Sequence, residues 1–98
     1  MKFDEFIHLI GTQARCPESV SSQLQALWYA KKGDWDKAHR LVQDADDADS
    51  AWVHAYLHRE EGDLSNARYW YKRSGRFECQ ESLEREWEQI VKDLLGEV

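Results

Sequence analysis

Long hydrophobic runs, prolines and cysteines are scarce in this sequence, and each shortage excludes a class of protein. No apolar stretch approaches the length needed to span a bilayer. Pro17 is the single proline, so long segments remain free to form helices. Cys16 and Cys79 are too few for a disulfide framework, and a chain of 98 residues can hold a modest core without one. Residues 1–11 include acidic side chains and lack the basic start of a secretory signal, so we expect a cytoplasmic protein.

An excess of basic residues is also missing. The chain carries 13 Lys and Arg against 19 Asp and Glu, which gives a net charge of −6. Such a surface repels phosphate, so we expect neither nucleic acid nor a membrane as partner. The sequence contains no G-x-S-x-G, no glycine-rich phosphate loop and no C-x-x-C, and neither cysteine has a histidine beside it to act as a base. We therefore predict no cofactor and no catalytic residue.

Alternation with a period of two is absent, whereas helical spacing and an internal repeat are present. Four small or acidic residues recur 29 residues later in the same order. They are Ala26, Gly33, Asp34 and Ala38 in the first unit and Ala55, Gly62, Asp63 and Ala67 in the second. Self-similarity at such a period is typical of stacked supersecondary units.

Each unit is predicted to be a helix, a Gly-Asp turn and a second helix. Gly33 and Gly62 should end the first helices, because glycine adopts the left-handed conformation at that position. Asp34 and Asp63 should cap the next helices by accepting hydrogen bonds from free N–H groups. The small alanines should lie where the paired helices approach closely.

Together these patterns predict an all-α fold of about six helices in a single domain, residues 1–98. The helices are expected over about 2–14, 18–32, 35–46, 50–61, 64–74 and 81–95. Pro17 suits the first turn of the second helix, and Asp49 or Ser50 suits the cap of the fourth. The repeat units span about 20–46 and 49–75, and the first and last helices should cap the open ends.

The turn and the alanine four residues after each aspartate resemble the tetratricopeptide repeat, although 29 residues is shorter than that family's period of about 34. Residues 67–74 resemble the A-x-x-W-Y-x-x-A stretch of Sel1-like repeats, with Ser74 at the final alanine. The resemblance implies a right-handed helical array. Residues 33–39 and 52–59 also resemble an uncharacterised family of small bacterial helical proteins, which implies a fold and no activity.

The aromatic content is high, with five Trp, four Tyr and three Phe. In tetratricopeptide-like hairpins the first helix lines the concave surface, which would place Trp52, Tyr56 and Arg59 in a groove with Trp70 and Arg73 nearby. We therefore predict a non-catalytic binding or protein-interaction module for a protein, peptide or small ligand. Alternatively, the last helix covers this groove. The sequence leaves the oligomeric state open.

His54 and His58 are four residues apart and share one helix face. Such a pair can bind zinc if a third ligand such as Glu61 or His39 is close. A metalloprotease would place glutamate directly after the first histidine, where this chain has Ala55. Partly buried, hydrogen-bonded histidines are the commoner outcome, so we expect no metal. The alternative is a small enzyme or a metal- or ligand-binding protein that uses both histidines with a nearby arginine or carboxylate.

Overall fold

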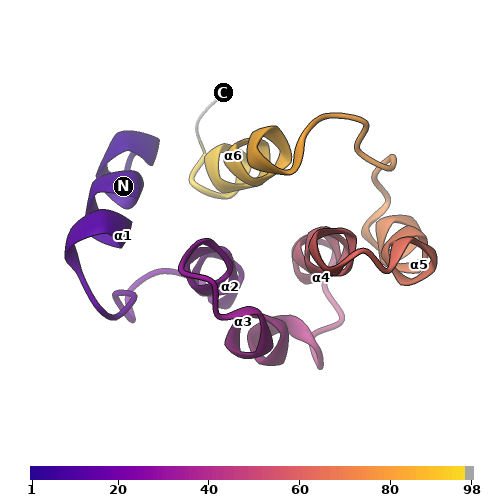
Figure 1. Cartoon of the computed structure of the whole chain (residues 1–98), viewed down its shortest axis with the longest axis horizontal. Helices are drawn as coiled ribbons and strands as arrows, with labels where there is room; N and C mark the ends of the chain where they lie inside the picture. The colour runs from indigo at the N-terminus through magenta and orange to yellow at the C-terminus, as the bar shows by residue number, and fades with distance from the viewer. Residues whose placement is uncertain (97–98) are drawn as a thin grey trace.

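The computed structural model describes residues 1–96 and is built from helices alone. The helices are α1 (Phe3–Thr12), α2 (Ser22–Lys31), α3 (Trp35–Val42), α4 (Ala48–Glu61), α5 (Leu64–Ser74) and α6 (Leu83–Leu94) (Figure 1). Residues 1–96 contain no strand. The predicted all-α class and the six helices are confirmed.

Both Gly-Asp turns have the predicted geometry. Gly33 and Gly62 have φ angles of 87° and 89°, in the left-handed region that favours glycine. The carboxylate of Asp34 accepts from the Lys37 N–H at 3.1 Å, and that of Asp63 accepts from the Asn66 N–H at 3.3 Å. The two hairpins, α2–α3 and α4–α5, are therefore turned and capped in the same way.

The start of α2 differs from the prediction. The helix begins at Ser22 and not at residue 18, because the Ser21 hydroxyl caps it by accepting from the Leu24 N–H. Pro17 lies in a separate turn, in which its carbonyl accepts from the Val20 N–H. The placement of Pro17 in the first turn of this helix is therefore wrong.

The cap of α4 was also predicted at the wrong residue. Asp47 caps this helix by accepting from the Ser50 N–H at 2.9 Å, so neither Asp49 nor Ser50 has that role. Ser50 is buried instead, and its hydroxyl oxygen accepts from the Gln23 side chain of α2. Both predicted ends of α5, the end of α4 and the start of α3 are confirmed. α3 ends at Val42 and not near residue 46, and the remaining ends differ from prediction by one or two residues.

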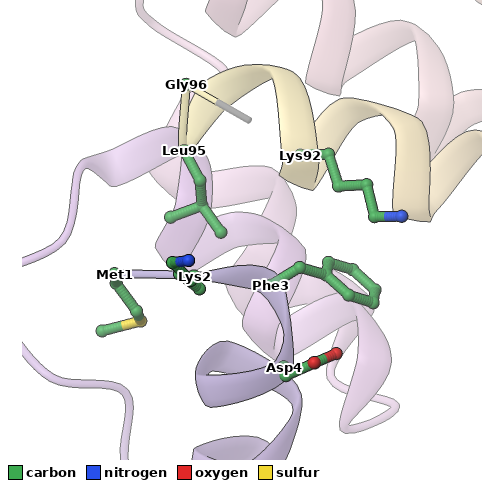
Figure 2. Close-up of a pocket in the computed structure, with 7 residues that line it drawn as sticks. All are labelled: Met1, Lys2, Phe3, Asp4, Lys92, Leu95 and Gly96. Carbon is green, nitrogen blue, oxygen red and sulfur yellow. The ribbon is translucent and has the colours of Figure 1, made fainter. Parts of the chain in front are cut away.

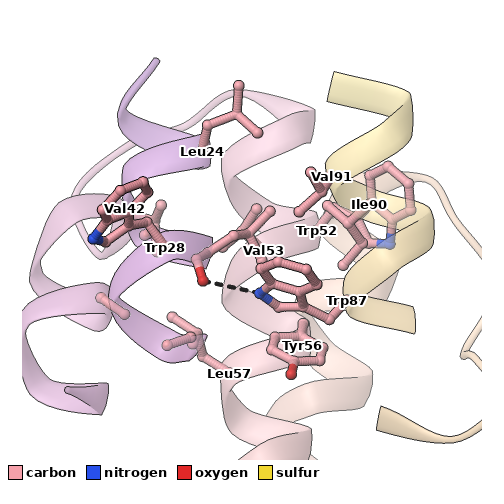
Figure 3. Close-up of a cluster of buried hydrophobic side chains, with 14 of the residues drawn as sticks. Leu24, Trp28, Val42, Trp52, Val53, Tyr56, Leu57, Trp87, Ile90 and Val91 are labelled. Atoms are coloured by element: carbon pink, nitrogen blue, oxygen red, sulfur yellow. Dashed lines mark hydrogen bonds between the residues drawn. The ribbon is translucent and has the colours of Figure 1, made fainter. Parts of the chain in front are cut away.

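α2 and α4 lie at the centre of the fold, and the other helices pack against this pair. Figure 1 shows α6 on one side of this pair and α3 on the opposite side, with α5 beyond α4 and α1 at the other end beside α2. Trp87 of α6 is buried and its indole N–H donates to the Leu27 carbonyl of α2 at 2.9 Å (Figure 3). Phe6 of α1 packs edge-on against Trp28. Because α4 has neighbours on several sides, every residue from 50 to 58 is buried.

Among residues 1–96, no helix has the length and apolar character that crossing a membrane requires.

Candidate functional site

Three histidines that are distant in sequence meet between α3 and α4. We call His39 of α3 with His54 and His58 of α4 the imidazole cluster. The Nε2 atoms of His39 and His54 are 3.0 Å apart, and one ring nitrogen from each histidine lies within 4.8 Å of the other two. The cluster therefore brings together the two histidines and one of the two third ligands that the sequence suggested.

The local fold explains why these side chains converge. His54 and His58 are one helical turn apart, and their rings stack with centroids 4.8 Å apart. On α3, Ala38 is fully buried in the hairpin interface, which directs the adjacent His39 toward the border with α4. His39 was a possible third ligand in the sequence, but its position relative to His54 and His58 could not be predicted. That position depends on how one hairpin packs against the next.

Two tryptophan rings hold the cluster from either side. Trp35 stacks on His39 with centroids 4.8 Å apart, and Trp70 of α5 stacks on His54 at 3.8 Å. Trp35 is itself fixed, because its indole N–H donates to the Leu57 carbonyl at 2.7 Å. Flat stacking of this kind limits ring rotation and so preorganises the imidazoles.

Burial keeps two of the imidazoles neutral. Desolvation, with smaller contributions from His39 and His58, lowers the pKa of His54 from 6.5 to about 4. Desolvation is also the main cause that lowers the pKa of His39, followed by His58. At neutral pH both rings are therefore neutral, and their Nε2 atoms form a hydrogen bond in which one donates and the other accepts. A metal ion bound by both Nε2 atoms would take the place of that proton.

His58 has a hydrogen-bond partner that orients its ring. Its Nδ1 lies 2.7 Å from the Oε1 atom of Glu61, one turn further along α4. A carboxylate in this position accepts a hydrogen bond from Nδ1–H and leaves the Nε2 lone pair for a ligand. Carboxylate–histidine–metal chains use this arrangement to fix the tautomer of the ligating histidine.

His54 is less well satisfied than a structural histidine normally is. Its side chain is buried, and its Nδ1 has no hydrogen-bond partner among the described residues. Buried polar atoms usually have a partner, because losing water without replacement costs about 1–3 kcal/mol. The cluster is thus a partly satisfied polar network inside the protein.

The donor set fits a transition-metal ion of the zinc class. Imidazole nitrogen is a preferred ligand of zinc, copper and nickel, whereas magnesium and calcium require oxygen. Zinc–nitrogen bonds of about 2.0–2.1 Å imply nitrogens about 3.3 Å apart in a tetrahedral site. The 3.0 Å separation of His39 and His54 is close to this value, and the nitrogen of His58 lies within 4.8 Å of both and would have to move closer to bind the same ion.

The predicted aromatic groove lies partly beneath α6. Trp52 is 6% exposed and Tyr56 4%, in the face of α4 that α6 covers. Arg59 is paired with the buried carboxylate of Glu86 on α6 at 2.9 Å, and the Tyr71 hydroxyl donates to the same carboxylate. These three predicted residues thus help to hold α6, and the alternative arrangement, in which the last helix covers the face, is the one observed.

Trp70 and Arg73 lie on the outer side, away from α6. Trp70 is half-buried because one face of its ring contacts His54. The exposed guanidinium of Arg73 lies 5.4 Å from the Trp70 ring, and Arg73 donates to the Tyr69 hydroxyl at 3.1 Å. These residues line the outer border of the imidazole cluster and do not join Trp52 in one surface.

A pocket of about 660 Å³ lies elsewhere, where the start of α1 meets the end of α6 (Figure 2). Its charged lining groups are Lys2, Asp4 and Lys92, and the Lys92 ammonium lies 5.0 Å from the ring centroid of Phe3. None of its lining residues is a histidine or cysteine. The imidazole cluster is therefore the stronger candidate for a chemical site.

Comparisons of this chain with known proteins found no matching family model, no similar curated protein and no similar solved structure.

Proposed function

We propose that the protein is a non-catalytic binding protein whose ligand is a divalent transition-metal ion of the zinc class, held by His39, His54 and His58. The observation that carries this proposal is the convergence of three ring nitrogens within 4.8 Å of one another, two of them on buried side chains. Neutral rings, stacked tryptophans and the Glu61 partner of His58 support it. It develops the alternative function, a metal-binding protein that uses His54 and His58.

A zinc-dependent thermal melt tests the proposal directly. Zinc at a hundredfold excess over its dissociation constant should stabilise the folded protein by about 2.7 kcal/mol, because it binds the native state. Calorimetric titration should give one ion per chain. Magnesium should have no effect, since it prefers oxygen ligands.

The chain contains its own control. His8 is exposed on α1, outside the cluster, and is the remaining histidine of the four. His8→Ala should respond to zinc as the wild type does, whereas His39→Ala should lose the response. The partly exposed His39 is preferred for this test, because its replacement disturbs the core less than replacement of His54. A wild-type melt that zinc leaves unchanged would overturn the proposal.

The protein-interaction function predicted from the sequence remains a second proposal. It is supported by apolar and basic side chains on α5 and the loop after it, where Tyr69 and Arg73 are exposed and Phe77 is 99% exposed. An exposed ring on a loop is a common anchor for a protein partner. Phe77→Ser should weaken such a complex, and Arg85→Ser, an exposed change on α6, should leave it intact.

A tetratricopeptide-like, right-handed arrangement of the hairpins is likewise a proposal, supported by the matching Gly-Asp turns at a spacing of 29 residues. The cytoplasm remains our prediction for its location, and the two free thiols, Cys16 and Cys79, suit a reducing compartment.

A further inference from the structure

The imidazole cluster offers a metal ion three donor atoms. Among the described residues, three ring nitrogens can reach a common ion. Glu61 and Asp63 belong to a second group of neighbouring donor atoms, which shares His58 with the cluster and includes neither His39 nor His54. The cluster therefore supplies three ligands where a tetrahedral ion takes four.

Glu61 is positioned behind His58 and not over the centre of the cluster. Its Oε1 atom is engaged by the Nδ1 of His58 at 2.7 Å, and its side chain is 37% exposed at the end of α4. A carboxylate that orients the far nitrogen of a histidine acts on the ion through that ring. We therefore assign Glu61 as a positioning residue and not as the fourth ligand.

His39 is the member of the cluster that a group from outside can approach. His54 and His58 are 3% and 6% exposed, whereas His39 is partly exposed on α3. Trp35 and Trp70 stack on His39 and His54 and so restrict ring motion without contributing a metal ligand. A site with three protein ligands and one accessible member differs from a closed structural site, in which four side chains surround the ion.

We propose that the fourth coordination position is filled from outside the chain and that the site transfers its ion to an acceptor by ligand displacement. This inference rests on the proposed metal-binding function. Water occupies the position at rest, and a nitrogen or sulfur donor of the acceptor displaces it to form a transient complex joined through the ion. Each imidazole would then leave as a neutral ring while a further donor of the acceptor, or a water molecule, takes its place on the ion. A thiol acceptor gives its proton to water, and the ion keeps its charge of 2+ throughout.

Transfer kinetics distinguish an open site from a closed one. Zinc-loaded protein is mixed with increasing concentrations of the chromogenic chelator 4-(2-pyridylazo)resorcinol, and the rate of colour formation is recorded. Displacement through an open position makes the observed rate constant rise in direct proportion to chelator concentration. Spontaneous release from a closed site makes that rate constant independent of the chelator.

A spectroscopic measurement checks the coordination directly. Cobalt(II) replaces zinc, and its visible bands should shift when free imidazole is added, because imidazole enters the open position. Glu61→Gln should keep the dependence on chelator concentration and the spectral shift, since Glu61 is not expected to be a ligand. The inference is wrong, and Glu61 is the fourth ligand, if the wild type shows no dependence on chelator concentration and no spectral shift while Glu61→Gln shows both.

The outcomes separate the two proposals. Both proposals are supported if each chain binds one zinc ion and the rate constant of transfer rises in proportion to chelator concentration. If each chain binds one zinc ion and this rate constant is independent of chelator concentration, the open site is overturned and the metal-binding function is left intact. Failure to bind zinc overturns both.

Discussion

The Nε2 atoms of His39 and His54 lie 3.0 Å apart, although the two residues belong to different helical hairpins. Because α3 and α4 are consecutive helices of separate repeat units, this contact joins the units at the site where an ion would bind. An ion held there would cross-link the hairpins, so metal binding and the packing of the two units should be coupled.

Glu61→Gln should lower zinc affinity by about 10–100-fold, because the amide is a weaker acceptor for the His58 N–H and no longer raises the basicity of the ring. Isothermal titration of wild type and variant measures the change. Glu78→Gln provides a matched control. Glu78 is an exposed carboxylate on the loop before α6, and it pairs with Arg68 of α5. Equal affinities for wild type and Glu61→Gln would show that the carboxylate does not tune the site.

The buried His54 should make stability depend on pH in metal-free protein. Its folded pKa of about 4 lies below the unfolded value of 6.5, so the unfolded chain binds the proton more readily. Stability is therefore full above about pH 6.5 and falls as the pH drops toward 4, by on the order of 3 kcal/mol. Urea unfolding in the presence of EDTA at several pH values measures this loss.

His54→Gln is the control for that pH profile. Burial raises the pKa of Glu60, which stabilises the folded protein as the pH falls and so acts in the opposite direction. Because Glu60 is present in both proteins, the difference between their profiles reports His54 together with its contact to His39. The variant should lose less stability than the wild type between pH 6.5 and 4, and parallel profiles would contradict the assignment of a neutral buried His54.

Arg59→Met should destabilise the fold by about 3–5 kcal/mol, because the carboxylate of Glu86 would remain buried without its positive partner. Glu86 is 1% exposed and retains the Tyr71 hydroxyl as donor. The double variant Arg59→Met/Glu86→Leu should recover much of the loss, since it removes the unpaired charge. Denaturant unfolding of the wild type, Arg59→Met, Glu86→Leu and the double variant gives the coupling energy, and additive effects would argue against a direct pair.

Ala67→Leu should destabilise the second hairpin by roughly 1–3 kcal/mol through overpacking. Ala67 of α5 is 2% exposed, and Ala55 of the paired helix α4 is fully buried. Ser65→Leu, an exposed change on the same helix, is the control and should be close to neutral. If denaturant melts show Ala67→Leu to be equally neutral, close packing at this position is not required.

Local chemistry explains which features could be predicted. The turns at Gly33 and Gly62 depend on a left-handed φ and a capping aspartate, both of which involve neighbouring residues only. The cap of α4 was missed although it is local. Residues 44–50 hold several aspartates and a serine that could each cap a helix, and Asp47 is selected by where the chain enters α4 and by its contact with Gln23 of α2.

The sequence alone determined that the chain forms helices, where the hairpins turn and that His54 and His58 share a face, because these properties follow from side chains within a few residues of each other. Tertiary structure decided that α6 covers Trp52 and Tyr56 and that His39 completes the imidazole cluster. Both depend on how helices distant in sequence pack side by side. That packing is a sum over many weak contacts, and no short motif encodes it.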